Sequence, residues 1–315
     1  MADLALFDLT GKKALVTGGA MGIGRALCLA LSRAGANVAI VDVNEQAGKA
    51  TSAELCSAGG NAFFVHCDVT SKADIDRALA RIVEEFGQLD IAVNNAGISR
   101  VTPDETTSEE DWAQVIALNL SATFFCCQAE ARQMLTQQPM GGKIVNIASM
   151  SASIANVNAS YCASKAGVVH MSRSLAAQWG KYNINVNCIS PTYVMSSMHG
   201  GTPAFVRNRM RELHPLGYLA RPRDLWGAVI FFASEASSYI TGQDLVVDGG
   251  HTLNVWLAPL KRVAPAKVDP AQEVEDLKHD LSTLGIEYTK EGVVPAFISR
   301  RKAQWERLFG GEPKP

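Results

Sequence analysis

The chain has no feature typical of a nucleic-acid-binding or membrane-spanning protein. Its 29 Lys and Arg residues nearly balance its 31 Asp and Glu residues. The chain therefore has no excess of positive charge with which to bind a polyanion. No segment is apolar for 18 consecutive residues, about the length that a transmembrane helix needs. The first ten residues contain Asp3 and Asp8 and no basic residue, unlike a secretory signal. We therefore expect a cytoplasmic protein that binds neither nucleic acid nor a membrane.

Cysteine and histidine are sparse, and their spacing matches no metal or redox motif. The seven cysteines form no C-x-x-C pair, are odd in number and lie mostly in apolar segments. That pattern is typical of buried, reduced thiols. The six histidines show no H-E-x-x-H spacing. We therefore expect no protein-built metal site.

The chain does contain enough apolar sequence for one large core. Of its 315 residues, 47% are hydrophobic and 19% are charged, which is typical of a globular protein. Short apolar strands alternate with helical segments, which indicates right-handed crossovers and a parallel sheet with helices on both faces. This predicts an α/β fold with a doubly wound parallel sheet. The predicted strands are 13–17, 37–43, 62–67, 89–93, 143–149, 184–189 and 244–248, and the predicted helices are 25–33, 72–86, 111–135, 159–181 and 224–233.

A glycine-rich turn joins the first predicted strand to the first helix. Gly18, Gly22 and Gly24 allow a tight turn and a close approach of the backbone to a pyrophosphate, which binds at the positive helix N-terminus. Asp42 ends the second strand, where a carboxylate accepts hydrogen bonds from the adenosine ribose. It would repel a 2′-phosphate, and neither residues 19–21 nor Val43 supply a compensating cation. The sequence therefore predicts a dinucleotide site that prefers NAD to NADP.

Polar residues stand at the carboxyl ends of several predicted strands. Asp42, Asp68, Asn95 and Ser149 all occupy such positions, and in a parallel sheet these ends meet at the edge where ligands bind. Aspartate and asparagine also end strands and cap helices without any ligand, so Asp68 alone would carry no functional inference. Taken together, the four positions predict one cleft.

Tyr161 and Lys165 lie four residues apart on the predicted helix 159–181, one turn apart on the same face. A free phenol titrates near pH 10, and a nearby ammonium favours its ionised form. Lowering the pKa of Tyr161 by about three units requires about 4 kcal/mol, which a close cation in a partly dry cleft supplies. Such a phenol exchanges protons near neutral pH. Because this spacing also occurs by chance, the catalytic interpretation depends on the surrounding motifs.

Together these motifs resemble the short-chain dehydrogenase/reductase family, in order and over about residues 9–250. The resemblance implies a seven-stranded Rossmann-like sheet, hydride transfer between a nicotinamide cofactor and a small-molecule alcohol or ketone, and a tendency to form homotetramers. The residues that carry it are Thr17-Gly18, Gly22, Gly24, Asn94-Asn95-Ala96-Gly97, Asn119, Ser149, Tyr161, Lys165, Pro191 and Val247-Asp248-Gly249-Gly250.

The resemblance also implies individual roles. Tyr161 would be the general acid/base, and Ser149 would polarise the carbonyl. Lys165 would bind the nicotinamide ribose and lower the pKa of Tyr161, and Asn119 would hold a water that relays protons. The implied cofactor-binding residues are Gly18, Gly22, Ile23, Gly24, Asp42, Asp68, Val69, Asn95, Ala96, Gly97, Tyr161, Lys165, Pro191, Val194 and Ser196.

Two positions depart from the family pattern. Thr192 follows Pro191 where the family usually has glycine, so we expect the backbone near the nicotinamide to take a different course. Met150 follows Ser149, without the glycine that is common two or three places after the serine. Ser151 is an alternative catalytic serine, and Ser149 is preferred because it ends the strand directly.

The chain continues beyond the usual end of the family. We expect a catalytic domain over residues 1–253 and an extension over 254–315, with one amphipathic helix opened by Asp269 and Pro270 and another over 295–309. Two such helices cannot form a stable domain alone. We therefore expect the extension to pack on the catalytic domain or on a neighbouring subunit.

The motifs leave the substrate open. The strand end at residues 146–151 is similar to polyol and ketose dehydrogenases of the family, which makes a polyol or sugar the first hypothesis. Steroid, acyl-thioester and aromatic diol substrates are alternatives. A non-catalytic NAD-binding scaffold is the rival from another class. Such proteins commonly lose the tyrosine or the lysine, and this chain keeps both.

Overall fold

Seven parallel strands form one sheet in the order β3-β2-β1-β4-β5-β6-β7, as the α/β prediction requires. The computed structural model describes residues 4–100, 102–156, 158–196 and 204–253. Strand order reverses between β1 and β4, and ligands bind at such a switch point in open α/β sheets. The strands are β1 (Lys13–Thr17), β2 (Asn37–Asp42), β3 (Ala62–His66), β4 (Ile91–Asn94), β5 (Gly142–Ile147), β6 (Ile184–Pro191) and β7 (Asp244–Val247).

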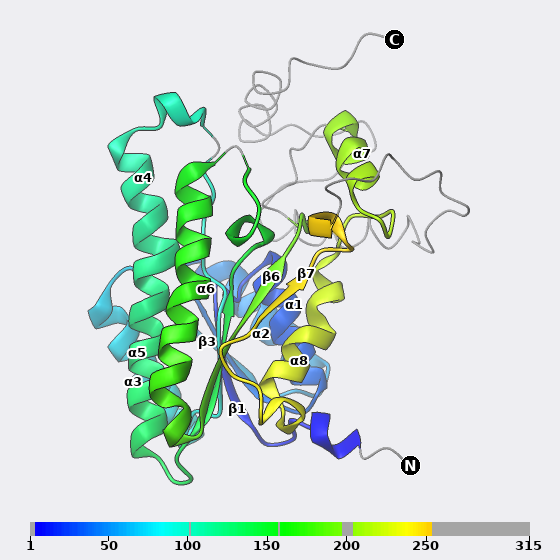
Figure 1. The fold of residues 1–315 in the computed structure, drawn as a ribbon. Coiled ribbons are helices and arrows are strands. Elements are labelled where there is room, and N and C mark those ends of the chain that lie inside the picture. Colours follow the sequence, from blue (N-terminus) through cyan, green and yellow to red (C-terminus); the bar gives the residue numbers. More distant parts are fainter. Residues whose placement is uncertain (1–3, 101, 157, 197–203, 254–315) are drawn as a thin grey trace.

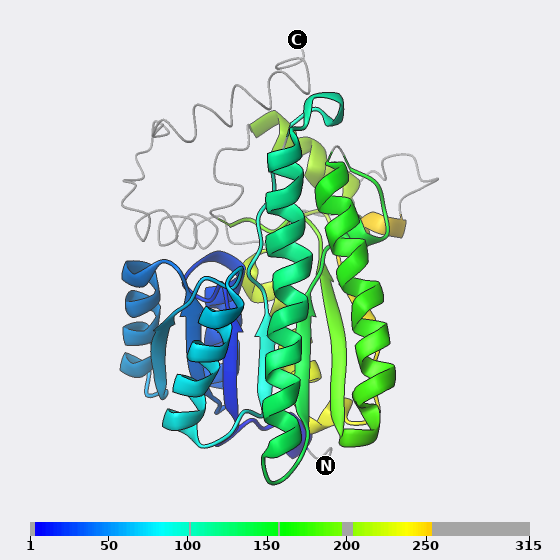
Figure 2. The same ribbon diagram turned by 90° about the vertical axis from the view of Figure 1, so that its left-hand side faces the viewer.

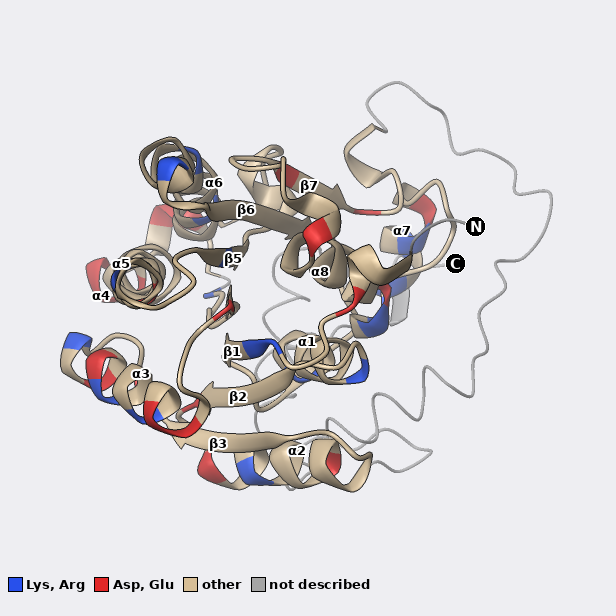
Figure 3. Ribbon diagram, turned by 90° about the horizontal axis from the view of Figure 1, so that it is seen from below, with Lys and Arg blue, Asp and Glu red and all other residues tan. Residues whose placement is uncertain are grey.

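Helices cover both faces of the sheet (Figures 1 and 3). One face carries α3 (Lys72–Phe86), α4 (Glu109–Ile116), α5 (Thr123–Thr136) and α6 (Ala159–Trp179), and the other carries α1 (Gly22–Arg33), α2 (Glu45–Ser57) and α8 (Trp226–Ala233). The long helices α5 and α6 lie side by side in front of the sheet (Figure 2). α7 (Ala204–Leu213) lies beyond the carboxyl ends of the strands (Figure 1).

The strands are apolar throughout because both of their faces are covered. Along β1, Leu15 packs in the core under α3 and α5, whereas Ala14 and Val16 pack in the core under α1 and α8. All three side chains are at most 4% exposed. This alternation explains why the sequence shows short apolar runs rather than a polar/apolar alternation. Charged residues of both signs lie on the exposed side of α3 (Figure 3), where Lys72 pairs with Asp76 and Arg81 pairs with Glu84.

The predicted segment 111–135 is helical, but it is not α-helical throughout. A π-helical stretch, Ala117–Ala122, separates α4 from α5 and contains Asn119. The wider turn changes the direction of the side chains relative to a continuous α-helix, and such insertions are frequent at functional sites. The long loop after β6 also contains α7, and α8 begins only after a 3₁₀ turn, Pro222–Leu225. The other predicted strands and helices agree with the structure, apart from shifts of up to three residues at their ends.

Some sequence predictions fall outside the described residues. The extension over 254–315 and the loop residues 197–203 belong to this group. Within the described ranges, no helix has the length and apolar character needed to cross a bilayer. The same ranges contain no cluster of three or more His, Cys, Asp or Glu residues arranged to hold a metal ion.

Candidate active site

The turn between β1 and α1 has a backbone that only glycine fits. Gly18 and Gly22 have φ angles of +61° and +56°, a region that other residues rarely adopt. A Cβ added at Gly24 would lie 1.9 Å from the carbonyl oxygen of Gly18. The glycines therefore bring the backbone close to the N-terminus of α1, which is the geometry that a pyrophosphate requires.

Side chains after β4 hold this turn in place. The Nδ2 of Asn95 donates to the carbonyl oxygens of Thr17 (3.1 Å) and Gly18 (3.0 Å). The Oγ1 of Thr17 accepts from the backbone amides of Asn95 (3.0 Å) and Ala96 (3.2 Å). The sequence reasoning assigned no role to the Thr17 side chain, although a hydroxyl at a strand end beside a glycine turn was a usable signal. These bonds join the ends of β1 and β4 at the switch point.

Asp42 lies at the end of β2 beside the glycine turn. Its carboxylate accepts from the backbone amides of Ala20 (3.0 Å) and Asn44 (2.9 Å), which hold it in one orientation. The next side chain, Val43, is 58% exposed and uncharged. Asp68 is exposed and accepts from the amide and hydroxyl of Thr70, so it also has the turn-forming role that needs no ligand.

Lys165, Asn119 and Gly97 converge near the end of β5. A Cβ added at Gly97 would lie 3.1 Å from Oδ1 of Asn119 and 3.6 Å from Nζ of Lys165. Lys165 is 4% exposed, and its Nζ donates to the carbonyl oxygen of Ile147 (2.8 Å). The same Nζ lies 5.8 Å from the centroid of the Tyr161 ring. Four segments that are far apart in the sequence thus meet in one place.

Asn119 connects the loop after β4 with the helix α6. Its Oδ1 accepts from the amide of Ile98 (2.9 Å), and its Nδ2 donates to the carbonyl oxygen of Ile98 (2.9 Å) and to Oγ of Ser164 (3.2 Å). The sequence reasoning missed Ser164, which lies directly before Lys165. The hydroxyl of Thr123 donates to the backbone carbonyl of Asn119 (2.9 Å).

The hydroxyl environment differs between Ser149 and Ser151. Ser149 is buried, forms a side-chain hydrogen bond with Tyr161, and accepts from the backbone amide of Ser151 (3.2 Å). The Oγ of Ser151 instead accepts from Nδ2 of Asn156 (2.6 Å). The choice of Ser149 over Ser151 is therefore consistent with the geometry.

The predicted lowering of the Tyr161 pKa by Lys165 is wrong for this structure. Burial raises the pKa of Tyr161 above its ordinary value, and the hydrogen bond from Ser149 lowers it only in part. Burial also lowers the pKa of Lys165 to about 8. Desolvation acts on both groups and favours their neutral forms. The spacing on the helix brought the two residues together, but the sequence did not show how deeply they are buried.

The remaining predicted cofactor residues lie at the same edge of the sheet. Pro191 ends β6, and Val194 forms a bridge with Ala220. Ser196 is 4% exposed and directly precedes residues 197–203, which the structure does not describe. Ile23 is half-buried in the first turn of α1, and Val69 is buried after β3.

Comparison with known proteins identifies the family. The family profile described as enoyl-(acyl carrier protein) reductase matches residues 18–252. D-threitol dehydrogenase of Mycolicibacterium smegmatis is 43% identical over 249 residues, which cover 78% of this chain and 95% of that protein. The chain belongs to the short-chain dehydrogenase/reductase family. As a member of this family it is an oxidoreductase that uses a nicotinamide dinucleotide.

Two further proteins similar to this short-chain dehydrogenase/reductase are named for hydroxylated substrates. NAD-dependent glycerol dehydrogenase of Listeria innocua is 38% identical, over 78% of this chain and 96% of that protein. The crystal structure of a gluconate 5-dehydrogenase from Burkholderia cenocepacia, in complex with NADP and tartrate, matches with a TM-score of 0.77 and 34% identity. That match covers 80% of this chain and 99% of the other chain.

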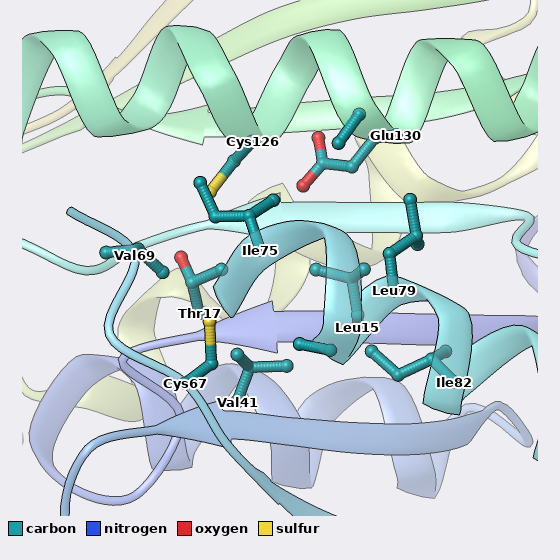
Figure 4. Close-up of a pocket in the computed structure, with 12 residues that line it drawn as sticks. Leu15, Thr17, Val41, Cys67, Val69, Ile75, Leu79, Ile82, Cys126 and Glu130 are labelled. Atoms are coloured by element: carbon teal, nitrogen blue, oxygen red, sulfur yellow. The ribbon is translucent and has the colours of Figure 1, made fainter. Parts of the chain in front are cut away.

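A buried carboxyl lies beneath the site of this short-chain dehydrogenase/reductase. Glu130 on α5 is 2% exposed, and its Oε2 accepts from Nδ2 of Asn94 (3.0 Å). Figure 4 shows it at the wall of a cavity of about 20 Å³, with Thr17 and apolar side chains of α3. Burial raises the pKa of Glu130 to about 8, against a lowering by the Asn94 bond. The carboxyl is therefore mostly neutral near pH 7.

Replacing Glu130 with glutamine should stabilise the protein at alkaline pH. The folded pKa of about 8 exceeds the ordinary value of 4.5. The contribution of Glu130 to the free energy of unfolding is therefore fully present below pH 4.5 and is lost as the pH rises through 8. Glutamine keeps an acceptor for Asn94 and cannot ionise. We expect Glu130→Gln to exceed wild type at pH 9 by roughly 3 to 5 kcal/mol, with little difference at pH 4.5, in urea unfolding. The exposed Glu84→Gln is the control, and equal pH slopes for wild type and Glu130→Gln would contradict the prediction.

Proposed function

We propose that the protein is an NAD-dependent dehydrogenase of a polyol or sugar that interconverts a secondary alcohol and its ketone. The convergence of Ser149, Tyr161, Lys165 and Asn119 beside the glycine turn carries this proposal. The names of the threitol, glycerol and gluconate dehydrogenases support the substrate class. Conversion of an alcohol to a ketone releases one hydride and one proton. The bound nicotinamide would accept the hydride, and Tyr161 would accept the proton.

The side chains of the site would handle the proton and the orientation of the substrate. When bound, the nicotinamide supplies the hydride acceptor or donor. Tyr161 would take the proton from the substrate hydroxyl during oxidation and return it during reduction. Ser149 would donate to the substrate oxygen and orient it. Lys165 would bind the nicotinamide ribose, and Asn119 would hold a water through which the proton reaches solvent.

The cofactor would lie across the carboxyl edge of the sheet. Gly18, Gly22 and Gly24, with Ile23, would hold the pyrophosphate at the N-terminus of α1. Asp42 would accept hydrogen bonds from the adenosine ribose, and Asp68 and Val69 would lie at the adenine. The middle of the cofactor would contact Asn95, Ala96 and Gly97, and the nicotinamide end would contact Tyr161, Lys165, Pro191, Val194 and Ser196.

NAD preference depends on the charge of Asp42. The carboxylate is held by two backbone amides and would oppose a 2′-phosphate, with the uncharged Val43 next to it. We expect Asp42→Asn to change the ratio of kcat/KM for NAD to that for NADP by about tenfold or more towards NADP. Steady-state kinetics with both cofactors measure this ratio, and the surface variant Asp76→Asn is the control. An unchanged ratio would show that other groups set the preference.

The direct test is NADH formation with a panel of polyols and sugar acids, including D-threitol, glycerol and gluconate. Turnover of one or more of them supports the proposal. NADH oxidation with a 3-oxoacyl thioester, but with no ketose, would favour the second candidate, an acyl-thioester reductase, which the 36% identity to the 3-oxoacyl-[acyl-carrier-protein] reductase of Chlamydia pneumoniae supports. Tight NAD binding without turnover of any compound would indicate a scaffold protein. The homotetramer, the cytoplasmic location and the packing of the extension stay predictions.

A further inference from the structure

The hydroxyl of Thr192 lies at a junction of several segments. Its Oγ1 is 2.8 Å from Nε2 of His214 and 3.2 Å from Sδ of Met150. His214, which directly follows α7, is 1% exposed, and its Nδ1 lies 2.5 Å from the carbonyl oxygen of Met210 in the last turn of α7. The ring of His251, which comes after β7, stacks on the His214 ring with centroids 4.7 Å apart.

The donors and acceptors determine the direction of these hydrogen bonds. A backbone carbonyl can only accept, so Nδ1 of His214 carries a hydrogen and donates to Met210. In a neutral imidazole Nε2 is then an acceptor, and the hydroxyl of Thr192 donates to it. A hydroxyl has one hydrogen, and the thioether of Met150 is a weak acceptor that competes poorly for it. A residue without a hydroxyl at position 192 would leave Nε2 of the buried ring without this donor.

The junction lies beside the part of the site proposed for the nicotinamide. Thr192 follows the last residue of β6, and its backbone amide donates to the carbonyl oxygen of Val247 at the end of β7 (3.1 Å). Two residues later, Val194 pairs with Ala220. Met150 is the residue after Ser149. The hydroxyl of Thr192 therefore connects the loop of the proposed catalytic serine, the segment 192–196 and the end of α7.

We propose that Thr192 and His214 are positioning residues, whose hydrogen bond holds the segment 192–196 and the end of α7 in the arrangement that the nicotinamide half of the cofactor and the substrate require. This inference rests on the proposed function. The inference also predicts that binding of one half of the cofactor, the adenosine half, does not depend on the hydrogen bond between Thr192 and His214. Asp42 ends β2, which lies four strands from β6 in the sheet, so binding of the adenosine half is independent of it.

Two variants test the hydroxyl separately from the shape. Thr192→Val keeps the branched shape and removes the donor, whereas Thr192→Ser keeps the donor. We expect Thr192→Val to raise the Kd for NAD at least fivefold relative to that for ADP-ribose, which lacks the nicotinamide. We also expect it to lower kcat/KM for the polyol at least tenfold. Thr192→Ser should stay within threefold of wild type in both quantities.

A spectroscopic measurement tests the bond without any turnover. The ¹⁵N spectrum of the wild-type imidazoles should show His214 with its hydrogen on Nδ1, and Thr192→Val should shift the Nε2 resonance while Thr192→Ser should not. If no polyol is turned over, the proposed function fails, but this spectrum and the ratio of NAD to ADP-ribose affinity still decide the inference.

A control separates positioning from a loss of stability. Ser237 is buried between α8 and β7, and its hydroxyl donates to the carbonyl oxygen of Phe232 (3.1 Å). Ser237→Ala removes a buried hydrogen bond next to Ser238, which contacts Asn185 at the start of β6, whereas Thr192 follows the end of that strand. It should lower the Tm without changing the ratio of the two affinities. A hydrogen on Nε2 of His214, or equal affinity ratios for wild type and Thr192→Val, would overturn the inference.

Discussion

Replacing Tyr161 with phenylalanine is expected to lower kcat about 10³-fold or more. The substitution removes one oxygen atom, the proposed proton acceptor of alcohol oxidation, and keeps the ring that packs beside Lys165. Tyr161 is one of the residues proposed to contact the cofactor, but the substitution leaves all the others unchanged, so the Kd for NAD should stay within about threefold of wild type. Initial-rate kinetics and cofactor titration together measure the two quantities. Tyr239→Phe is the matched control, since Tyr239 is fully exposed.

The pH dependence follows from the direction of the Tyr161 pKa. Burial raises this pKa above its ordinary value of 10, so the ionised fraction that accepts a proton keeps increasing from pH 7 to pH 10. The rate of alcohol oxidation should therefore rise across that interval, and the rate of ketone reduction should not. A plateau below pH 8 would instead mean that the assembled site lowers the pKa. Substantial activity of Tyr161→Phe would contradict the role of the phenol altogether.

The sequence was informative wherever the local backbone or the position in a strand restricts which residue types can occur. Gly18 and Gly22 were predictable because their positive φ angles exclude most side chains, and Asp42 was predictable because strand ends of a parallel sheet share one edge. The apolar strands were evident for a similar reason, since both faces of the sheet are covered.

The sequence was less informative where a property depends on distant parts of the chain. The pKa of Tyr161 is set by burial, which no spacing on one helix reveals. The π-helical stretch contains Asn119, whose side chain bonds to Ile98 and Ser164, which lie 21 and 45 residues away. The contact between Thr192 and His214 spans 22 residues and one helix. A departure from the family pattern marked Thr192, but its partner became visible only in the folded chain.

Replacing Lys165 with methionine should nearly abolish turnover while leaving the protein at least as stable as wild type. Lys165 is buried, and its pKa is lowered from 10.5 to about 8. The charged form is thus disfavoured in the folded state, by roughly 3 kcal/mol on this shift. Methionine fills a similar volume without a charge and loses one hydrogen bond to Ile147, which is worth about 1 kcal/mol. The expected net change is a gain of roughly 1 to 3 kcal/mol at pH 7.

The sign of the pH dependence distinguishes this effect from ordinary repacking. Between pH 8 and 10.5 the unfolded chain holds a proton on Lys165 that the folded chain has released, so wild-type stability increases with pH. The advantage of Lys165→Met should therefore shrink over that interval in urea unfolding, whereas the exposed Lys181→Met should show no such trend. A clear loss of stability at pH 7 would show that the ammonium supports the fold. The expected combination, greater stability with turnover reduced about 10³-fold or more, would show that position 165 holds a lysine for the reaction and not for folding.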